Sequence, residues 1–598
     1  MHSLRALRPR TSALLAAGFC AWLVSPLASA ASEPSVEDKA AHVLNRLGYG
    51  PRPGEVARVA ELGPENWIRL QLEPRTIPDP AADAALAGLT KLKIPRADLV
   101  ETYQRETRER ARLQRAQGRQ DAEAVAQIRS EMREHEQAVV AQALGELQYA
   151  KLARAVLSER QLEQVLVDFW FNHFNVDARK QQVRATVVGY EQDTIRPHVF
   201  GNFRDLLGAT AHSAAMLVYL DNFRSSREME LGPREQAAAE RLRREVMGED
   251  EMAPAADGEN PAATAAAPAT PAKRGLNENY GRELLELHTL GVDGGYAQGD
   301  VQEVARAFTG WTINPRNGDF LFRRAWHDNE PKKILGVDFA AGGGVKDGEK
   351  VLDLLATHPA TAKRIATKLC QRFVADEPPA PLVERVAKAF LDSKGDLRAT
   401  YEAIFFSPEF FAAEHMRSKT KSPFEFAASA LRASGAELVE GETVRARLPL
   451  RAVEAGAALG RGGDRLDRMA RKTMLLHLVE LGQPPYVWGP PTGFPEDSTH
   501  WVSAGALVSR LNFSLALTGG QVADARVDSR RLIGSANADR PDEVVAALSS
   551  SVLGRGPSEG TRRVLIEQAA PARDGATALP DVPKLLALLL GSPEFQRR

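Results

Sequence analysis

The sequence predicts a mainly α-helical protein. Ala, Leu, Arg and Glu, which have high helix propensity, are abundant along the 598-residue chain. The alternation of apolar and polar residues that marks a half-buried strand is scarce. We therefore expect a large multi-helix, bundle-like architecture with a long charged helical arm and one disordered insertion.

Residues 1–30 have the pattern of a cleavable secretory signal peptide. Arginines at the start precede an apolar run from Ala13 to Leu27, and Ala28-Ser29-Ala30 supplies the small residues that a signal peptidase recognises. The run is too short for a permanent transmembrane helix, and no later stretch is long enough. We expect a periplasmic or secreted protein without a stable membrane span; the alternative is an uncleaved anchor.

Charge and cysteine content exclude several classes of function. Lys and Arg number 77 against 78 Asp and Glu, so no global field favours nucleic acid or an anionic membrane. Cleavage of the signal peptide removes Cys20 and leaves only Cys370, so the mature chain has no internal disulfide. HExxH and CxxC motifs are absent from the sequence, which argues against zinc-protease and zinc-finger sites.

The first part of the mature chain divides into two regions. Residues 31–96 form an N-terminal helical segment that begins with Ser35 as N-cap, with Asp38 reaching back to it. Residues 97–163 are charged and helix-prone, and Gly118 is the expected break between two helices. This region predicts a long helical arm with a solvated face.

The rest of the chain is predicted to form the helical body. Residues 164–430 make up the core helical region, which we expect to hold a polar pocket. Within it, residues 248–273 are dominated by Ala, Pro, Glu and Thr, a composition that predicts a disordered insertion. Residues 431–598 form the C-terminal helical region. In the core region, Asp168 and Asn172 are four residues apart and share one face of an aromatic-rich helix.

The helix predicted from Asn277 to His288 is the strongest candidate for carrying chemistry. Asn279, Glu283 and Glu286 fall at positions i, i+4 and i+7, and therefore on one face. Two carboxylates on a face among apolar neighbours are costly unless they are paired or bound to a metal. We expect these two glutamates to converge with other polar side chains.

A short helix expected from about Asp300 to Trp311 places Asp300 and Glu303 on one face with Arg306. If this face and that of Glu283 meet, the carboxylates form a cage for a divalent or transition metal ion, which histidines complete. The expected metal ligands are His173, His212, Glu283, Glu286, Asp300 and Glu303.

Catalysis is expected around the same pocket. His327 and Asp328 form a loop pair that supplies a general acid or base; the alternative is a surface turn. The expected catalytic residues are Glu283, Glu286, His288, His327 and Asp328. A structural ionic network with Arg274, Arg282 and Arg306 remains the alternative for the carboxylates.

Short motifs spread along the chain match one family. The most specific runs from Gly275 to Gly291. The others are 42–46 with 48–51, 169–174, 216–222, 300–311, 358–362, Lys421-Ser422-Pro423, Gly482-Gln483-Pro484 and 510–513. On these motifs the chain resembles the bacterial domain-of-unknown-function family 1800 over most of its mature length.

The resemblance implies an exported, mainly helical protein without an agreed activity. It also implies a partner, because genes of this family often lie beside one for an exported protein of domain-of-unknown-function family 1501. We expect a periplasmic enzyme that carries out metal-assisted hydrolysis or oxidation at the carboxylate and histidine pocket. The alternative is a non-catalytic assembly or binding partner of another exported protein, which would use the charged arm.

Overall fold

The computed structural model describes residues 33–134, 139–180, 182–228, 275–439, 471–537, 539–569 and 579–598. The predicted signal peptide and the predicted insertion lie outside the described residues. In the part that is described, the chain is mainly helical, as predicted, and no helix is long and apolar enough to cross a membrane.

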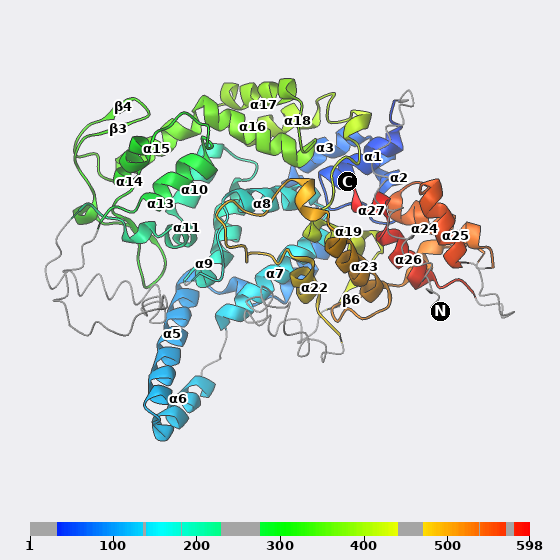
Figure 1. Cartoon of the computed structure of the whole chain (residues 1–598), viewed down its shortest axis with the longest axis horizontal. Coiled ribbons are helices and arrows are strands. Elements are labelled where there is room, and N and C mark those ends of the chain that lie inside the picture. Colours follow the sequence, from blue (N-terminus) through cyan, green and yellow to red (C-terminus); the bar gives the residue numbers. More distant parts are fainter. Residues whose placement is uncertain are drawn as a thin grey trace, which may run out of the picture.

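The N-terminal segment forms short helices, α1 (Val36–Arg46), α2 (Glu55–Leu62), α3 (Pro64–Leu72) and α4 (Pro80–Ala87). Of these, α1, α2 and α3 lie together near the C-terminus of the chain (Figure 1), while the fourth, α4, packs on α7 (Val139–Leu157). The Ser35 side chain accepts a hydrogen bond from the backbone N–H of Asp38 at 3.1 Å, so the predicted N-cap is confirmed. Arg46, in the last turn of α1, is completely buried.

The arm is shorter than predicted. Helix α5 (Arg96–Gly118) ends at the expected break, and α6 (Ala122–Glu134) folds back against it; together they project from the body (Figure 1). Helix α7 (Val139–Leu157), which was expected to continue the arm, lies in the core instead. The composition of α7 explains this position, because the helix is rich in Ala, Val and Leu. Most of its residues are buried.

The body consists of helices that share one continuous hydrophobic core. Those of the predicted core region are α8 (Gln161–His173), α9 (Val183–Gly189), α10 (Phe203–His212), α11 (Ala214–Tyr219), α13 (Glu278–Glu283), α14 (Gln298–Ala307), α15 (Val345–Ala356), α16 (Pro359–Phe373), α17 (Ala380–Asp392), α18 (Leu397–Phe405) and α19 (Pro423–Ala433). The C-terminal helices are α22 (Met474–Leu481), α23 (Ala504–Thr518), α24 (Pro541–Leu553), α25 (Glu559–Ala569), α26 (Val582–Leu590) and α27 (Pro593–Gln596).

Strands contribute only short antiparallel pairs. They are β1 (Trp311–Ile313) with β2 (Phe320–Phe322), β3 (Lys332–Ile334) with β4 (Val337–Phe339), and β5 (Glu437–Leu438) with β6 (Ala525–Arg526). The helix expected to reach Trp311 ends at Ala307, and Gly310, with a φ of 81°, turns the chain into β1.

The last residues of the chain return to the centre of the body. Thr420 pairs with Arg597 in an isolated β-bridge, and the backbone N–H of Arg598 donates to the carbonyl oxygen of Lys419 at 2.8 Å. Arg598 is 3% exposed, so the end of the chain is part of the core. This return brings Arg598 beside α16 and α19, where a small polar cavity lies.

Candidate functional site

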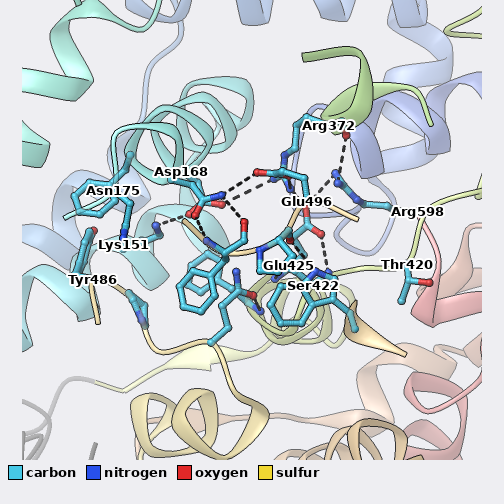
Figure 2. Close-up of a pocket in the computed structure, with 18 residues that line it drawn as sticks. Lys151, Asp168, Asn175, Arg372, Thr420, Ser422, Glu425, Tyr486, Glu496 and Arg598 are labelled. Atoms are coloured by element: carbon cyan, nitrogen blue, oxygen red, sulfur yellow. Dashed lines mark hydrogen bonds and ion pairs between the residues drawn. The ribbon is translucent and has the colours of Figure 1, made fainter. Parts of the chain in front are cut away.

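A polar cavity of about 40 Å³ lies where α7, α8, α16, α19 and the loop between α22 and α23 meet (Figure 2). A water molecule needs roughly 10–15 Å³ of such space, so the cavity holds a few waters or one small polar group. We call it the central pocket. The side chains that define it are those of Lys151, Asp168, Asn172, Asn175, Arg372, Glu425, Tyr486, Glu496 and Arg598.

Asparagines at the end of α8 hold the loop of residues 482–503 against the pocket. Asn172 accepts from the backbone N–H of Phe494 at 2.7 Å and donates to its carbonyl oxygen at 2.9 Å. Asn175 donates to the carbonyl oxygens of Trp488 and Pro490 at 3.0 and 2.9 Å. The asparagine amides thus form hydrogen bonds with backbone groups of the loop that no neighbouring strand satisfies, and these bonds fix the position of the loop.

Tyr486 carries backbone strain at the wall of the pocket. It is 2% exposed and has a φ of 67°, a left-handed conformation that a bulky side chain rarely adopts. Its carbonyl oxygen accepts from the N–H of Ala178 at 2.9 Å, and its hydroxyl donates to Glu191. Strain of this kind persists only where surrounding contacts enforce it, and it is concentrated at functional sites.

Glu425 is the centre of the charge network in the pocket. Ser422 caps α19: its hydroxyl accepts from the Glu425 N–H at 3.3 Å, and its own N–H donates to the Glu425 carboxylate at 2.8 Å. The same carboxylate lies 2.7 Å from Arg372 and 3.0 Å from Arg598. Burial raises the pKa of Glu425, but the two arginines outweigh burial and lower it to about 2.

Two further carboxylates complete the network around Arg372. Asp168 lies 4.0 Å from Arg372 and accepts a hydrogen bond from Lys151, whose ammonium group is 5.1 Å from the centre of the Tyr486 ring. Glu496 lies 3.6 Å from Arg372 and accepts from Asn172 at 3.1 Å. Figure 2 shows these charged groups from separate elements gathered around one space.

The close contact between the loop of residues 482–503 and Asn172 predicts that a methyl group added at Gly493 displaces this loop. At Gly493, with a φ of 73°, an added Cβ would lie 2.2 Å from the Asn172 carbonyl oxygen and 2.6 Å from its side-chain oxygen. We expect Gly493→Ala to displace the loop and to expose Trp488 and Trp501, measured as a red shift of tryptophan fluorescence. The control is Gly482→Ala, where φ is 93° but no atom lies within 4 Å of the added Cβ. Equal spectra for the two variants would contradict the close contact between this loop and Asn172.

The structure brings together some of the sequence-predicted residues. His173 Nε2 lies 3.1 Å from the carbonyl oxygen of His288, and their ring centres are 6.4 Å apart. Burial lowers the pKa of both histidines, to about 3 for His288, so both are neutral at pH 7. Burial raises the pKa of Glu283, and the charge of Glu286 nearby raises it further.

The remaining predicted residues take other partners. Asp300 accepts from the N–H of Leu335 at 2.7 Å, and His212 lies 3.0 Å from Glu349. Arg306 pairs at 2.8 Å with both Glu303 and Asp328. His327, fully buried, lies 3.2 Å from Asp347, to which Lys332 donates at 2.8 Å.

The expected metal cage is therefore not formed. Across the described residues, no three His, Cys, Asp or Glu side chains are placed so that they could hold a metal ion. The alternative of an ionic network is found for Glu303 and Asp328, which share Arg306. Among the described residues no ion pair is found for Glu283: Arg282 pairs with Glu278 at 3.5 Å, although its charge still lowers the pKa of Glu283, and Arg274 lies outside the described residues. Catalytic roles for the individual residues stay predictions.

Sequence reasoning missed most of the central pocket. Asp168 and Asn172 were recognised as sharing a helix face, and both line the pocket. Ser422 and Gln483 belong to motifs that carry the family resemblance, and they line it too. Those motifs were the available signal. Nothing in the local pattern singles out Arg372 or Arg598, because what gives them a role is their meeting at Glu425.

The comparisons with known proteins give one match. The family described as "Protein of unknown function (DUF1800)" matches residues 42–597, which is nearly the whole chain. No curated protein and no solved structure matches the chain.

Proposed function

Because the chain belongs to the DUF1800 family, whose function is unknown, we propose its function from the geometry: it is an exported protein whose central pocket binds a small polar ligand. One observation carries this proposal. The strained, buried Tyr486 and the buried charges of Arg372, Glu425 and Arg598 meet at a single cavity. Strain and buried charge both cost stability, and proteins retain them where function requires them.

The charge states in the pocket favour recognition over proton transfer. Glu425, with a pKa of about 2, stays ionised at neutral pH, and the neighbouring carboxylates raise the pKa of Arg372 even though burial lowers it. Groups whose charge does not change near pH 7 make poor general acids and bases. They do make fixed dipoles and hydrogen-bonding groups that orient a ligand, while the ring of Tyr486 supplies an apolar wall.

A ligand screen tests the proposal. Wild-type protein, Gly493→Ala and Gly482→Ala would be compared by thermal unfolding with panels of sugars, amino acids, organic acids and phosphate compounds. We expect at least one class to raise the Tm of the wild type and of Gly482→Ala, but to have a much smaller effect on Gly493→Ala. A panel that acts equally on all three proteins would contradict a ligand site at the central pocket.

Export is the second element of the proposal. The basic, apolar and small-residue parts of residues 1–30 support it. We expect protein from the native host to begin near Ala31 by N-terminal sequencing and to fractionate with the periplasm or the medium. Intact Met1 in the cytosolic fraction would contradict export. An exported protein of domain-of-unknown-function family 1501 remains the predicted partner, and the arm of α5 and α6 is the surface we propose for it.

A second function, acid–base chemistry at Glu283, is favoured by a different observation. Glu283 lies at the junction between α13 and a π-helical turn, η8 (Leu284–His288), and such turns are frequent at functional sites. Burial and then Glu286 raise the pKa of Glu283, which moves it toward the range useful for proton transfer. His288, neutral because its pKa is about 3, lies in the same turn.

Substitution of Glu283 separates this function from a structural role. A carboxyl group whose native pKa is raised destabilises the fold as pH rises above its ordinary pKa, because the unfolded state then releases its proton first. We expect Glu283→Gln to raise the free energy of unfolding at pH 7. The control, Glu303→Gln, removes an ion pair with Arg306 and should lower it. Urea denaturation measures both; a loss of stability in Glu283→Gln would indicate a structural carboxylate.

A further inference from the structure

The surroundings of the central pocket carry an excess of buried positive charge. Within electrostatic range of Glu425 lie Arg46, Arg372, Lys419, Lys421, Arg510 and Arg598. Lys419 has its own ion pair with Asp376, and Lys151 has one with Asp168. The other five cations share the carboxylates of Glu425 and Glu496, and one of the five, Arg372, also lies 4.0 Å from Asp168. Such an imbalance is costly in a region of low dielectric constant.

The pKa values of three of these cations are lowered from their ordinary values, in each case first by burial. Burial first, opposed by Glu425, lowers the pKa of Arg510 to about 10. Burial, together with Arg372, lowers the pKa of Arg598 to about 10, and Glu425 again opposes this shift. For Lys421 the pKa falls to about 7, through burial together with Arg598 and Arg510. An additional negative charge at the pocket would therefore be stabilised by its surroundings.

Hydrogen-bond donors of the arginines also lack acceptors. Arg372 Nε and Nη2 and Arg598 Nε make no hydrogen bond among the described residues, and the closest carboxylate to Arg372 Nη2 is that of Asp168, at 4.0 Å. Arg598 Nη1 faces the Glu425 carboxylate at 3.0 Å, and Nη2 donates to the carbonyl oxygen of Arg372 at 3.3 Å. The two side chains are 5% and 3% exposed, and both line the cavity. Arg46, which is 0% exposed, likewise leaves Nε and Nη1 without an acceptor. A guanidinium group only donates, so these nitrogens require acceptor oxygens.

We infer that the central pocket recognises an oxyanion, the carboxylate or phosphate group of a small ligand, through Arg372 and Arg598. This rests on the proposed function of the pocket as a ligand site. The Nε and Nη2 groups of Arg372 and the Nε group of Arg598 are donors without a hydrogen-bond acceptor among the described residues, and the oxygens of either anion can accept from them. The cavity of about 40 Å³ admits one such group. Gln483 at its wall accepts from the N–H of Phe424 through its amide oxygen, which leaves its amide nitrogen for the rest of the ligand.

Anion binding to the mature chain tests the inference. Thermal unfolding would be followed at pH 7.5 with inorganic phosphate or sodium acetate, at an ionic strength kept constant with sodium chloride. We expect one of the two anions to raise the Tm along a saturable curve; which one does so distinguishes a phosphate from a carboxylate ligand. Tryptophan fluorescence, to which Trp501 at the pocket contributes, should change with the same midpoint.

Variants locate the anion. Arg598→Gln should weaken the apparent affinity at least tenfold. Arg385→Gln is the matched control, since Arg385 is half-exposed and pairs with Glu409 away from the cavity lining; its affinity should equal that of the wild type. If Arg598→Gln is too unstable to purify, Asn172→Ala serves as the second variant, and the fluorescence midpoint of the wild type still decides whether an anion binds.

The outcomes separate this inference from the proposed function. If neither anion shifts the Tm beyond the sodium chloride reference, while a neutral ligand of the screen acts on the wild type but not on Gly493→Ala, the oxyanion inference is wrong and the ligand site stands. If no ligand of either kind acts, both are wrong. An anion effect that Arg598→Gln and Asn172→Ala leave unchanged places the anion elsewhere and overturns the inference.

Discussion

Replacing Glu425 by glutamine is expected to lower the free energy of unfolding by about 3–5 kcal/mol, because it leaves Arg372 and Arg598 buried without their closest carboxylate. The capping bond to Ser422 weakens as well, since the amide is a poorer acceptor. The measurement is urea denaturation at pH 7 for the wild type and the Glu425→Gln variant.

The control for Glu425 is a glutamate paired on the surface. Glu437 lies 3.3 Å from Arg531, and both side chains are at least 70% exposed, so Glu437→Gln should cost less than about 1 kcal/mol. The pH dependence provides a second check. Because the native pKa of Glu425 is depressed to about 2, its contribution is present above the ordinary carboxyl pKa and is lost as pH falls toward 2. Equal losses for the two variants would contradict a central role for Glu425.

Replacing Lys421 by methionine is expected to stabilise the protein at neutral pH. Burial lowers the pKa of Lys421 to about 7, with Arg598 and Arg510 acting in the same direction and Glu425 against them. The ammonium group donates to Ser429 at 2.8 Å and has no carboxylate within ion-pair distance among the described side chains. Methionine preserves the volume and removes the charge, so the gain at pH 7 should reach a few kcal/mol.

The pH profile gives the sign of this effect. Between pH 7 and the ordinary lysine pKa of 10.5, the unfolded state binds more protons at Lys421 than the native state does. The unfolding free energy of the wild type should therefore rise across this window, and that of Lys421→Met should rise less. The control, Lys388→Met, changes a lysine that is 74% exposed and should follow the wild type. Parallel curves for wild type and Lys421→Met would contradict the burial of an uncompensated lysine.

Local pattern was sufficient for the class of fold and for individual helix ends. The cap at Ser35 and the break at Gly118 depend on residues within one or two turns, and both lie where the pattern predicts them. The length of the arm could not be predicted from local charge. Helix α7 was expected in the solvated arm, but its contacts with α9, α19 and α4 place it in the body. Helix propensity does not report such contacts.

The expected metal cage failed for a physical reason that lies in the helix itself. The spacing of Glu283 and Glu286 implies a shared face only if the helix stays α-helical. The chain instead enters the π-helical turn η8 immediately after Glu283, which adds a residue to the turn and rotates the positions that follow. In addition, Glu303 and Asp328 each form an ion pair with Arg306 at 2.8 Å, so both carboxylates already have a positively charged partner.

The central pocket could not be assembled from the sequence because its parts are far apart along the chain. Asn172 and Phe494 are separated by 322 positions, and Arg372 meets both Glu425 and the last residue, Arg598. No periodicity reports contacts at that separation. The family motifs at Ser422 and Gln483 pointed to the correct segments, but only the fold shows that these segments share one cavity.

The most direct test of a ligand site at the central pocket is a crystal structure of the mature protein purified from its native host. We predict a small bound molecule in the central pocket, with an oxygen atom within hydrogen-bonding distance of Arg372 or Arg598. A central pocket that contains only water, together with a ligand or a metal ion bound beside Glu283 and His288, would contradict the account.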